Sequence, residues 1–178
     1  MKLQESSIAG VWVLEAAVVQ DERGTFARTF CRDELLAHGL DARVAQCSLS
    51  RNLRRGTLRG MHYQAAPHAE LKLIRCTLGS VFDVALDLRP ESATFCRWLG
   101  FELSAEAPRS LYLPPGVAHG FVTLSDDAEL CYQISVPYAP AAARGVRWDD
   151  PVFDIRWPLR PLVMSEKDRS YPDFLIPS

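Results

Sequence analysis

The sequence lacks any excess of basic residues, because its 20 lysines and arginines face 22 aspartates and glutamates, for a net charge of −2. Proteins that bind nucleic acid usually present a basic face, so we expect no nucleic-acid partner. No apolar run approaches the roughly 20 residues needed to cross a bilayer. Residues 1–7 also lack the apolar centre of a signal peptide. We therefore expect no membrane partner.

Paired cysteines are lacking as well. The five cysteines are odd in number and widely scattered, and no two have the CxxC spacing. Disulfide frameworks and zinc sites are built from closely spaced or paired cysteines. We expect reduced thiols in a cytoplasmic protein, most of them serving as small core residues.

What the sequence does contain is a series of short apolar segments separated by glycine and proline. At 178 residues and 48% hydrophobic content, the chain predicts a single domain spanning 1–178. One helix is predicted at 33–39. The last forty residues are rich in proline and predict an irregular segment, with a helical turn capped by Ser165. Strands are predicted at 8–19, 43–50, 57–64, 70–78, 81–88, 95–103, 109–113, 120–124 and 129–136. This spacing indicates a sandwich or a barrel.

The most informative stretch is 57–64, followed by 71–75, because it brings Arg59, His62 and Lys72 close together between apolar residues. These side chains can hold an anion, remove a proton and stabilise an enolate. Strict alternation would place His62 on one face of its strand and Arg59 on the other. A bulge at Gly60 would change the parity and bring both into one pocket. The sequence leaves that point open.

Four strand positions have two readings each. Lys72 shares a face with Ile74 and Cys76, so it either extends outward to water or lies in a partly dry pocket. Tyr132 is either a core tyrosine or a proton donor. Asp83 and Asp87 share one face of their strand and are either solvated, the reading favoured by the sequence, or line a polar cavity.

A second motif, Pro114-x-Gly116-x-x-His119, resembles the second signature of the cupin superfamily of small β-barrels. In metal-binding cupins the first signature supplies His-x-His and a glutamate. The corresponding residues here are His62, Tyr63 and Gln64, so the second histidine is missing. His62 and His119 alone would not give the usual three or four protein ligands, and we expect no metal site.

Together these segments resemble the dTDP-4-dehydrorhamnose 3,5-epimerase family along almost the whole chain. The resemblance implies an all-β fold, a cupin-type jelly-roll β-barrel with one or two short helices and an irregular C-terminal segment. It also implies a homodimer without metal or organic cofactor. The stretches that carry it are 21–26, 56–64, 72–75, 83–89, 115–121, 124–126, 145–151 and 165–168.

The resemblance also implies residue roles. His62 matches the general base, Asp168 the carboxylate that orients it, Tyr132 the general acid and Lys72 the residue near the substrate carbonyl. The positions that match the lining of the nucleotide-sugar site are Arg23, Phe26, Gln46, Arg59, His119 and Lys167.

The implied reaction is epimerisation of a nucleotide-linked 4-keto-6-deoxy sugar at C3 and C5, or at C3 only. The expected conversion is dTDP-4-dehydro-6-deoxyglucose to dTDP-4-dehydrorhamnose. A ketone at C4 acidifies the hydrogens at C3 and C5, so a base on one face and an acid on the other can invert each centre. Two alternatives are a metal-dependent cupin oxygenase and a non-catalytic sugar-binding barrel.

Three residues depart from the family pattern. Arg28 and Ala143 stand where the family usually has an acidic residue, and Ser48 stands where it usually has asparagine. All three positions are associated with nucleotide contacts. We therefore expect an intact catalytic set, and the three departures raise the alternative hypothesis that the recognised base or sugar differs.

Binding of dTDP compared with CDP, GDP and UDP tests this hypothesis. Altered base recognition predicts that dTDP is not clearly preferred, because the changed side chains contact the nucleotide. A clear preference for dTDP in titration calorimetry would refute it.

Overall fold

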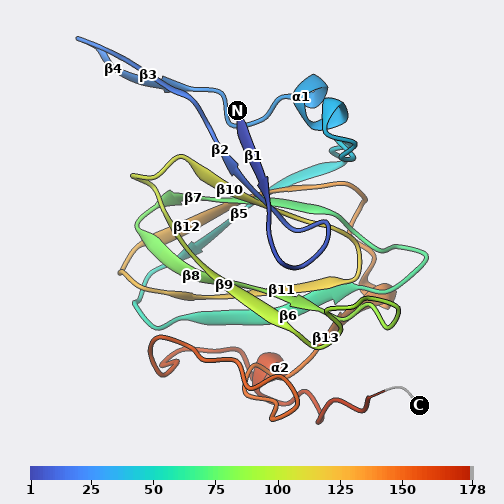
Figure 1. Ribbon diagram of the computed structural model, residues 1–178. Helices are drawn as coiled ribbons and strands as arrows, with labels where there is room; N and C mark the ends of the chain where they lie inside the picture. Colours follow the sequence, from blue (N-terminus) through green and yellow to red (C-terminus); the bar gives the residue numbers. More distant parts are fainter. Residues whose placement is uncertain (177–178) are drawn as a thin grey trace.

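Two antiparallel sheets pack face to face in the computed structural model, which describes residues 1–176 (Figure 1). The six-stranded sheet has the order β1 (Lys2–Glu5), β2 (Trp12–Glu15), β10 (Arg109–Leu113), β7 (Lys72–Leu78), β12 (Ala128–Ile134), β5 (Gln46–Asn52). The five-stranded sheet has the order β13 (Ala143–Gly145), β6 (Leu58–Gln64), β11 (Val117–Thr123), β8 (Ser80–Asp87), β9 (Trp98–Ser104). The expected all-β jelly roll is confirmed.

The apolar core between the sheets follows from alternation along the strands. On β7, Ile74 and Cys76 face inward, and on β12 Leu130 does the same. The same faces continue into Lys72 and Tyr132, which line a cavity at one end of the barrel. One strand face therefore supplies both the core and the functional site.

The outer face of the six-stranded sheet is covered by helix α1 (Arg32–Ala37), whose Leu35 packs against Leu73 and Tyr112. This helix confirms the one predicted at 33–39. Gly39 follows it with φ +72°, a backbone conformation that favours glycine and ends the helix.

The C-terminal segment covers the outer face of the five-stranded sheet (Figure 1). Phe153 and Phe174 pack there with Val84 and Leu86. The segment is irregular, as predicted, apart from the short η1 (Pro140–Ala142), the three-residue strand β13 and the turn α2 (Glu166–Arg169). The Ser165 hydroxyl accepts a hydrogen bond from the Asp168 backbone at 3.1 Å and caps α2. Residues 177–178 of the predicted irregular segment lie outside the described part.

The expectation that Asp83 and Asp87 are solvated is wrong, because both side chains are fully buried. The C-terminal segment covers the apolar side of β8, so the carboxylates point into the barrel. Burial alone would raise the pKa of Asp87, but hydrogen bonds from Arg89, Ser92 and Thr94 outweigh it and hold the pKa at about 2. Asp87 is thus part of a closed structural network.

A third sheet, of two strands, extends away from the barrel (Figure 1). It consists of the hairpin β3 (Val18–Asp21) and β4 (Gly24–Ala27). The apolar side chains of Val19 and Phe26 are 64% and 74% exposed. The sequence analysis placed residues 18–19 in a strand but did not predict the hairpin.

All five cysteines are free, and only Cys76 is buried, so the expectation that most are core residues is wrong. Some predicted strand bounds also differ. β9 begins at Trp98, not at residue 95, because the preceding residues form turns that include Cys96 at φ +62°. Within residues 1–176, no helix has the length and apolar character needed to span a membrane.

Strand β6 contains a bulge at Gly60 and Met61. The register pairs His62 with His119 and Arg59 with Phe121, so two residues of β6 lie opposite one residue of β11. Gly60 adopts φ +146°, and a Cβ there would lie 2.4 Å from the Gly120 Cα. Only glycine permits this approach of the two strands.

Replacement of Gly60 by alanine should therefore destabilise the protein strongly. We expect a loss of at least ~2 kcal/mol in the free energy of unfolding, since backbone strain and a backbone clash combine. Gly24→Ala is the matched control, because Gly24 also has positive φ but a Cβ there meets nothing within 4 Å. Equal losses in urea unfolding would contradict the packing argument.

Candidate active site

A cavity of about 870 Å³ opens between the two sheets at the end of the barrel where β6, β7, β11 and β12 carry polar side chains. Residues 163–168 of the C-terminal segment form another wall. Eight of the ten predicted site residues line it: Gln46, Arg59, His62, Lys72, His119, Tyr132, Lys167 and Asp168.

The bulge in β6 is what brings Arg59 and His62 into the same cavity. It places the extra residue between them, so both side chains face the interior although they are three positions apart. Met61 points to the other side of the sheet, where it is fully buried against Ala118 and Val146. The open question about the parity of this strand is thereby answered in favour of a shared pocket.

His62 and Asp168 form a hydrogen-bonded pair, with His62 Nε2 2.7 Å from Asp168 Oδ1. Asp168 is 4% exposed, and its other oxygen accepts from the Gly60 N–H at 3.4 Å. Burial alone would raise the pKa of Asp168, but the hydrogen bond from His62 and the charge of that ring outweigh it. The net pKa lies below the ordinary value, so Asp168 is a carboxylate that can fix the imidazole ring.

Lys72 lies in the wall of the cavity, so of its two readings the partly dry pocket is the correct one. Its side chain is 8% exposed, and Nζ lies 2.8 Å from Glu70 Oε1. Nζ also donates to the His62 backbone oxygen at 3.0 Å. An ammonium has three donors, so one remains available for a substrate oxygen.

A second histidine–aspartate pair lies beside the first. His119 Nε2 is 2.7 Å from Asp83 Oδ2, and both side chains are buried. The Tyr132 ring stands nearly perpendicular to the His119 ring, with centroids 5.7 Å apart. Sequence analysis noted Asp83 but did not count it among the site residues. The signal was its position on the same strand face as Ala85, which packs in the core.

The Tyr132 hydroxyl has no hydrogen-bond partner among residues 1–176, and it is not one of the buried polar atoms without a partner. It is therefore accessible from the cavity that Tyr132 lines. Burial raises the pKa of Tyr132 well above its usual value, and the Asp83 charge adds to this while Arg59 opposes it. The phenol is protonated at neutral pH and can act as an acid.

The polar residues at the mouth of the cavity are held by neutral partners. Arg59 Nε donates to Asn52 Oδ1 at 2.7 Å, and Gln46 Nε2 donates to the Val136 oxygen at 3.0 Å. Neither contact neutralises the Arg59 charge, so its guanidinium can still bind an anion.

Two predicted site residues, Arg23 and Phe26, are not brought to this cavity within one chain. They lie on the projecting hairpin β3–β4, and the Arg23 side chain is 85% exposed and paired with Asp21. The three departures from the family pattern are also separated. Ser48 and Ala143 line the cavity, whereas Arg28 lies outside it, 3.5 Å from Glu34.

Some lining residues were missed by sequence analysis, notably Glu70, Tyr138 and Arg144. Arg144 lies on the three-residue strand β13, which has no recognisable strand pattern. Tyr138 lies in a proline-rich stretch that reads as irregular. Their places depend on how the chain leaves β12 and pairs with β6, which no local pattern specifies.

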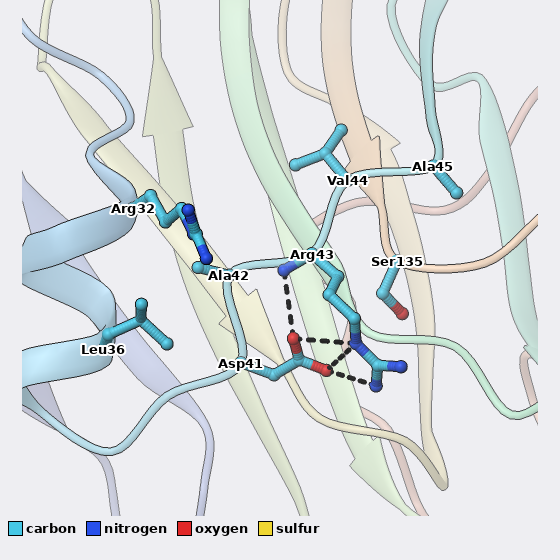
Figure 2. Close-up of a pocket in the computed structure, with 8 residues that line it drawn as sticks. All are labelled: Arg32, Leu36, Asp41, Ala42, Arg43, Val44, Ala45 and Ser135. Atoms are coloured by element: carbon cyan, nitrogen blue, oxygen red, sulfur yellow. Dashed lines mark hydrogen bonds and ion pairs between the residues drawn. The ribbon is translucent and has the colours of Figure 1, made fainter.

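A second hollow, of about 510 Å³, lies between α1 and residues 41–45 (Figure 2). Figure 2 shows Asp41 and Arg43 turned toward each other, with Arg43 Nη2 2.6 Å from Asp41 Oδ2. The charges of Asp41 and Arg43 are thus paired with each other, and none of the predicted site residues lines this hollow. Among residues 1–176, no cluster of three His, Cys, Asp or Glu side chains is placed to hold a metal ion.

Comparisons with known proteins agree on one family. Residues 5–175 match the profile described as dTDP-4-dehydrorhamnose 3,5-epimerase. The chain is 41% identical to the dTDP-4-dehydrorhamnose 3,5-epimerase of Shigella flexneri, covering 94% of this chain and 93% of that protein. It is 38% identical to the dTDP-4-dehydrorhamnose 3-epimerase of Streptomyces niveus, covering 95% and 82%.

A solved structure gives the same result. The chain superposes with a TM-score of 0.88 on the dTDP-6-deoxy-D-glucose-3,5-epimerase of Legionella pneumophila in complex with dTDP-4-keto-L-rhamnose. The two are 36% identical, with coverage of 94% of this chain and 89% of that one.

The lowered pKa of Asp168 predicts a pH-dependent contribution to stability. A carboxyl whose pKa is lower in the folded state stabilises the fold above its unfolded pKa, near 3.8, and loses this contribution as the pH falls through the folded value. Wild type should therefore exceed Asp168→Asn in unfolding free energy at pH 7, and the difference should shrink toward pH 3. Asp33→Asn, at an exposed carboxylate, is the control. A difference that stays constant with pH would contradict the pairing.

Proposed function

The chain belongs to the dTDP-4-dehydrorhamnose 3,5-epimerase family and is a carbohydrate epimerase; we propose that it inverts C3 and C5 of dTDP-4-dehydro-6-deoxyglucose to give dTDP-4-dehydrorhamnose. The observation that carries the residue assignment is the shared cavity. His62, with a carboxylate behind it, and Tyr132, a phenol kept protonated, both line one cavity of about 870 Å³.

The reaction needs a base, an acid and a stabilised oxyanion. His62 takes the proton from the carbon beside the C4 carbonyl, and Asp168 holds its ring and stabilises the imidazolium that forms. The electron pair of the broken C–H bond forms a double bond between that carbon and C4. The π pair of the carbonyl moves to the C4 oxygen, which gives the enolate. The Lys72 ammonium, held in a dry wall, stabilises that oxygen. Tyr132 then gives its proton to the carbon from the opposite face, which inverts the centre.

The nucleotide and diphosphate are proposed to lie toward the mouth of the cavity. Arg59 and Lys167 supply positive charge there, and Arg59 has only a neutral partner. Guanidinium groups bind phosphate oxygens in pairs, so Arg59 suits the diphosphate. Gln46 completes the polar lining there, and His119 lines the same cavity.

The predicted roles of Arg23 and Phe26 require a second copy of the chain, and we infer a homodimer. The hairpin that carries them presents exposed Val19 and Phe26, which favour burial. Strand β5 is an edge of the six-stranded sheet and contributes Gln46 and Ser48 to the cavity. Edge strands pair readily with strands of another chain. A two-fold dimer in which each hairpin reaches the partner's β5 would complete both sites.

We propose that the protein is a single domain and acts in the cytoplasm on a nucleotide-sugar substrate. A non-catalytic sugar-binding barrel would not need a histidine–aspartate pair and a protonated phenol in one cavity. The Streptomyces niveus relative, described as a 3-epimerase, keeps inversion at C3 alone as a second possible outcome.

Incubation with dTDP-4-dehydro-6-deoxyglucose in heavy water tests the function directly. The wild type should incorporate two deuterons, one at C3 and one at C5, as measured by mass spectrometry. His62→Ala should slow incorporation by ~10²–10⁴-fold, the usual contribution of a general base, and leave dTDP binding unchanged. His68→Ala, at an exposed histidine outside the cavity, is the matched control.

The outcomes are distinct. One deuteron, at C3, would reassign the protein as a 3-epimerase. Unchanged incorporation in His62→Ala would refute the base assignment, and no incorporation in the wild type would refute the proposed substrate.

A further inference from the structure

Two buried side-chain polar atoms in residues 1–176 have no hydrogen-bond partner, Asp83 Oδ1 and Tyr171 OH. Such atoms are rare in folded proteins because each costs the hydration it has lost. Asp83 is the more demanding case, since its carboxylate can carry a full charge and its side chain is 0% exposed. Both atoms lie next to the site, Tyr171 beside the His62 ring and Asp83 behind His119.

Asp83 has one partner, the His119 ring. Its Oδ2 lies 2.7 Å from His119 Nε2, and no other hydrogen bond to the Asp83 side chain occurs among the described residues. A buried carboxylate with a single partner is stable only if that partner compensates its charge. A positive charge on the His119 ring would compensate this carboxylate, and in that state both ring nitrogens carry hydrogen.

The first pair differs in this respect. Asp168 accepts from the Gly60 N–H as well as from His62, and the His62 side chain is 41% exposed. The Asp168 carboxylate therefore has a second donor besides its histidine, whereas Asp83 has only the His119 ring. His62 and His119 are also direct cross-strand neighbours, so two positive rings side by side would repel each other.

The free nitrogen of His119 faces the cavity. His119 lines the cavity, and its Nδ1 has no partner among residues 1–176, yet it is not one of the buried atoms without a partner. It is therefore accessible from the cavity. A charged ring with Nε2–H on Asp83 would present Nδ1–H to whatever the cavity holds.

We propose that Asp83 is a positioning residue for the reaction, which holds His119 so that its Nδ1–H donates a hydrogen bond to the C4 oxygen as that oxygen becomes an enolate. This inference rests on the proposed function. No bond to the oxygen forms or breaks in this contact: the carbon-bound proton goes to His62, the electron pair goes to the C4 oxygen, and His119 keeps its proton. Lys72 and His119 then approach the oxygen as two donors from adjoining walls.

The surroundings of the pair agree with this role. The negative charge of Asp83 helps to raise the pKa of Tyr132, after burial, so the same carboxylate keeps the proton donor protonated. It also contributes, after burial, to the raised pKa of Cys76. The other charged or titratable groups that strands bring to the cavity are Arg59, His62 and Tyr63 on β6, Lys72 on β7 and Arg144 on β13.

Nitrogen-15 NMR of the wild-type protein tests the charge of the ring without any variant. With the four histidines labelled and the His119 signals identified by their loss in His119→Gln, we expect both His119 nitrogens to be protonated at neutral pH. In Asp83→Asn, one of them should lose its proton. A neutral His119 ring in the wild type at pH 7 would overturn the proposal.

A double-mutant cycle tests the route of the effect. Loss of one oxyanion donor typically costs about 10²–10³-fold in kcat, so His119→Gln should lose this much. Asp83→Asn should lose about 10–10²-fold, with its dTDP binding unchanged. Because Asp83 acts through His119, the double variant should be no slower than His119→Gln. Multiplication of the two losses would contradict the proposal.

Asp87→Asn is the matched control, since Asp87 is equally buried on the same strand face and its network is structural. It should lower stability and leave the His119 signals and kcat unchanged. The failure of this inference is separable from that of the proposed function: the latter appears as absent deuterium incorporation in the wild type, whereas the NMR readout needs no substrate.

Discussion

The close approach of Gly60 to Gly120 is the constraint on which the site depends. A hypothetical Cβ on Gly60 would lie 2.4 Å from the Gly120 Cα, so the two strands can touch only where both residues are glycine. The extra residue that this approach accommodates turns Arg59 and His62 to the same side of β6. The Gly60 N–H also reaches Asp168 Oδ2, so the same residue helps to hold the carboxylate behind the base.

The barrel interior changes character along its strands. Toward one end it is filled by apolar side chains such as Ile74 and Leu130, which supply a rigid frame. Toward the other end the same strand faces carry Lys72 and Tyr132. The C-terminal segment completes the cavity by bringing Asp168 to His62 across 106 positions of the chain. A site built in this way holds the base and the acid in one cavity while leaving a mouth for a nucleotide.

Much of this could be predicted from the sequence because the signals were local. The turn at Gly39, the capping of α2 by Ser165 and the alternation that groups Lys72 with Ile74 all depend on neighbouring residues, and all are confirmed. The site residues came from ordered motifs that resemble a family, and eight of ten meet in one cavity. The resemblance also implied the His62–Asp168 pair, which strand periodicity alone does not reveal.

The remainder depends on tertiary contacts. Asp83 and Asp87 were expected in water, but the C-terminal segment buries the opposite face of β8 and turns both inward. The bulge at Gly60 could be suspected but not decided, since it requires the partner strand. Arg23 and Phe26 lie on a hairpin whose position is explained by a second chain, which no single sequence specifies.

The central claim is that His62 and Tyr132 act on one sugar ring from opposite faces. A crystal structure of the protein with a bound dTDP-linked 4-keto-6-deoxy sugar tests it most directly. The account predicts the ring between the two side chains, with C3 or C5 at about 3–3.5 Å from the His62 ring nitrogen and the Tyr132 hydroxyl on the other side. A sugar ring bound outside the cavity, or with both side chains on the same face, would contradict it.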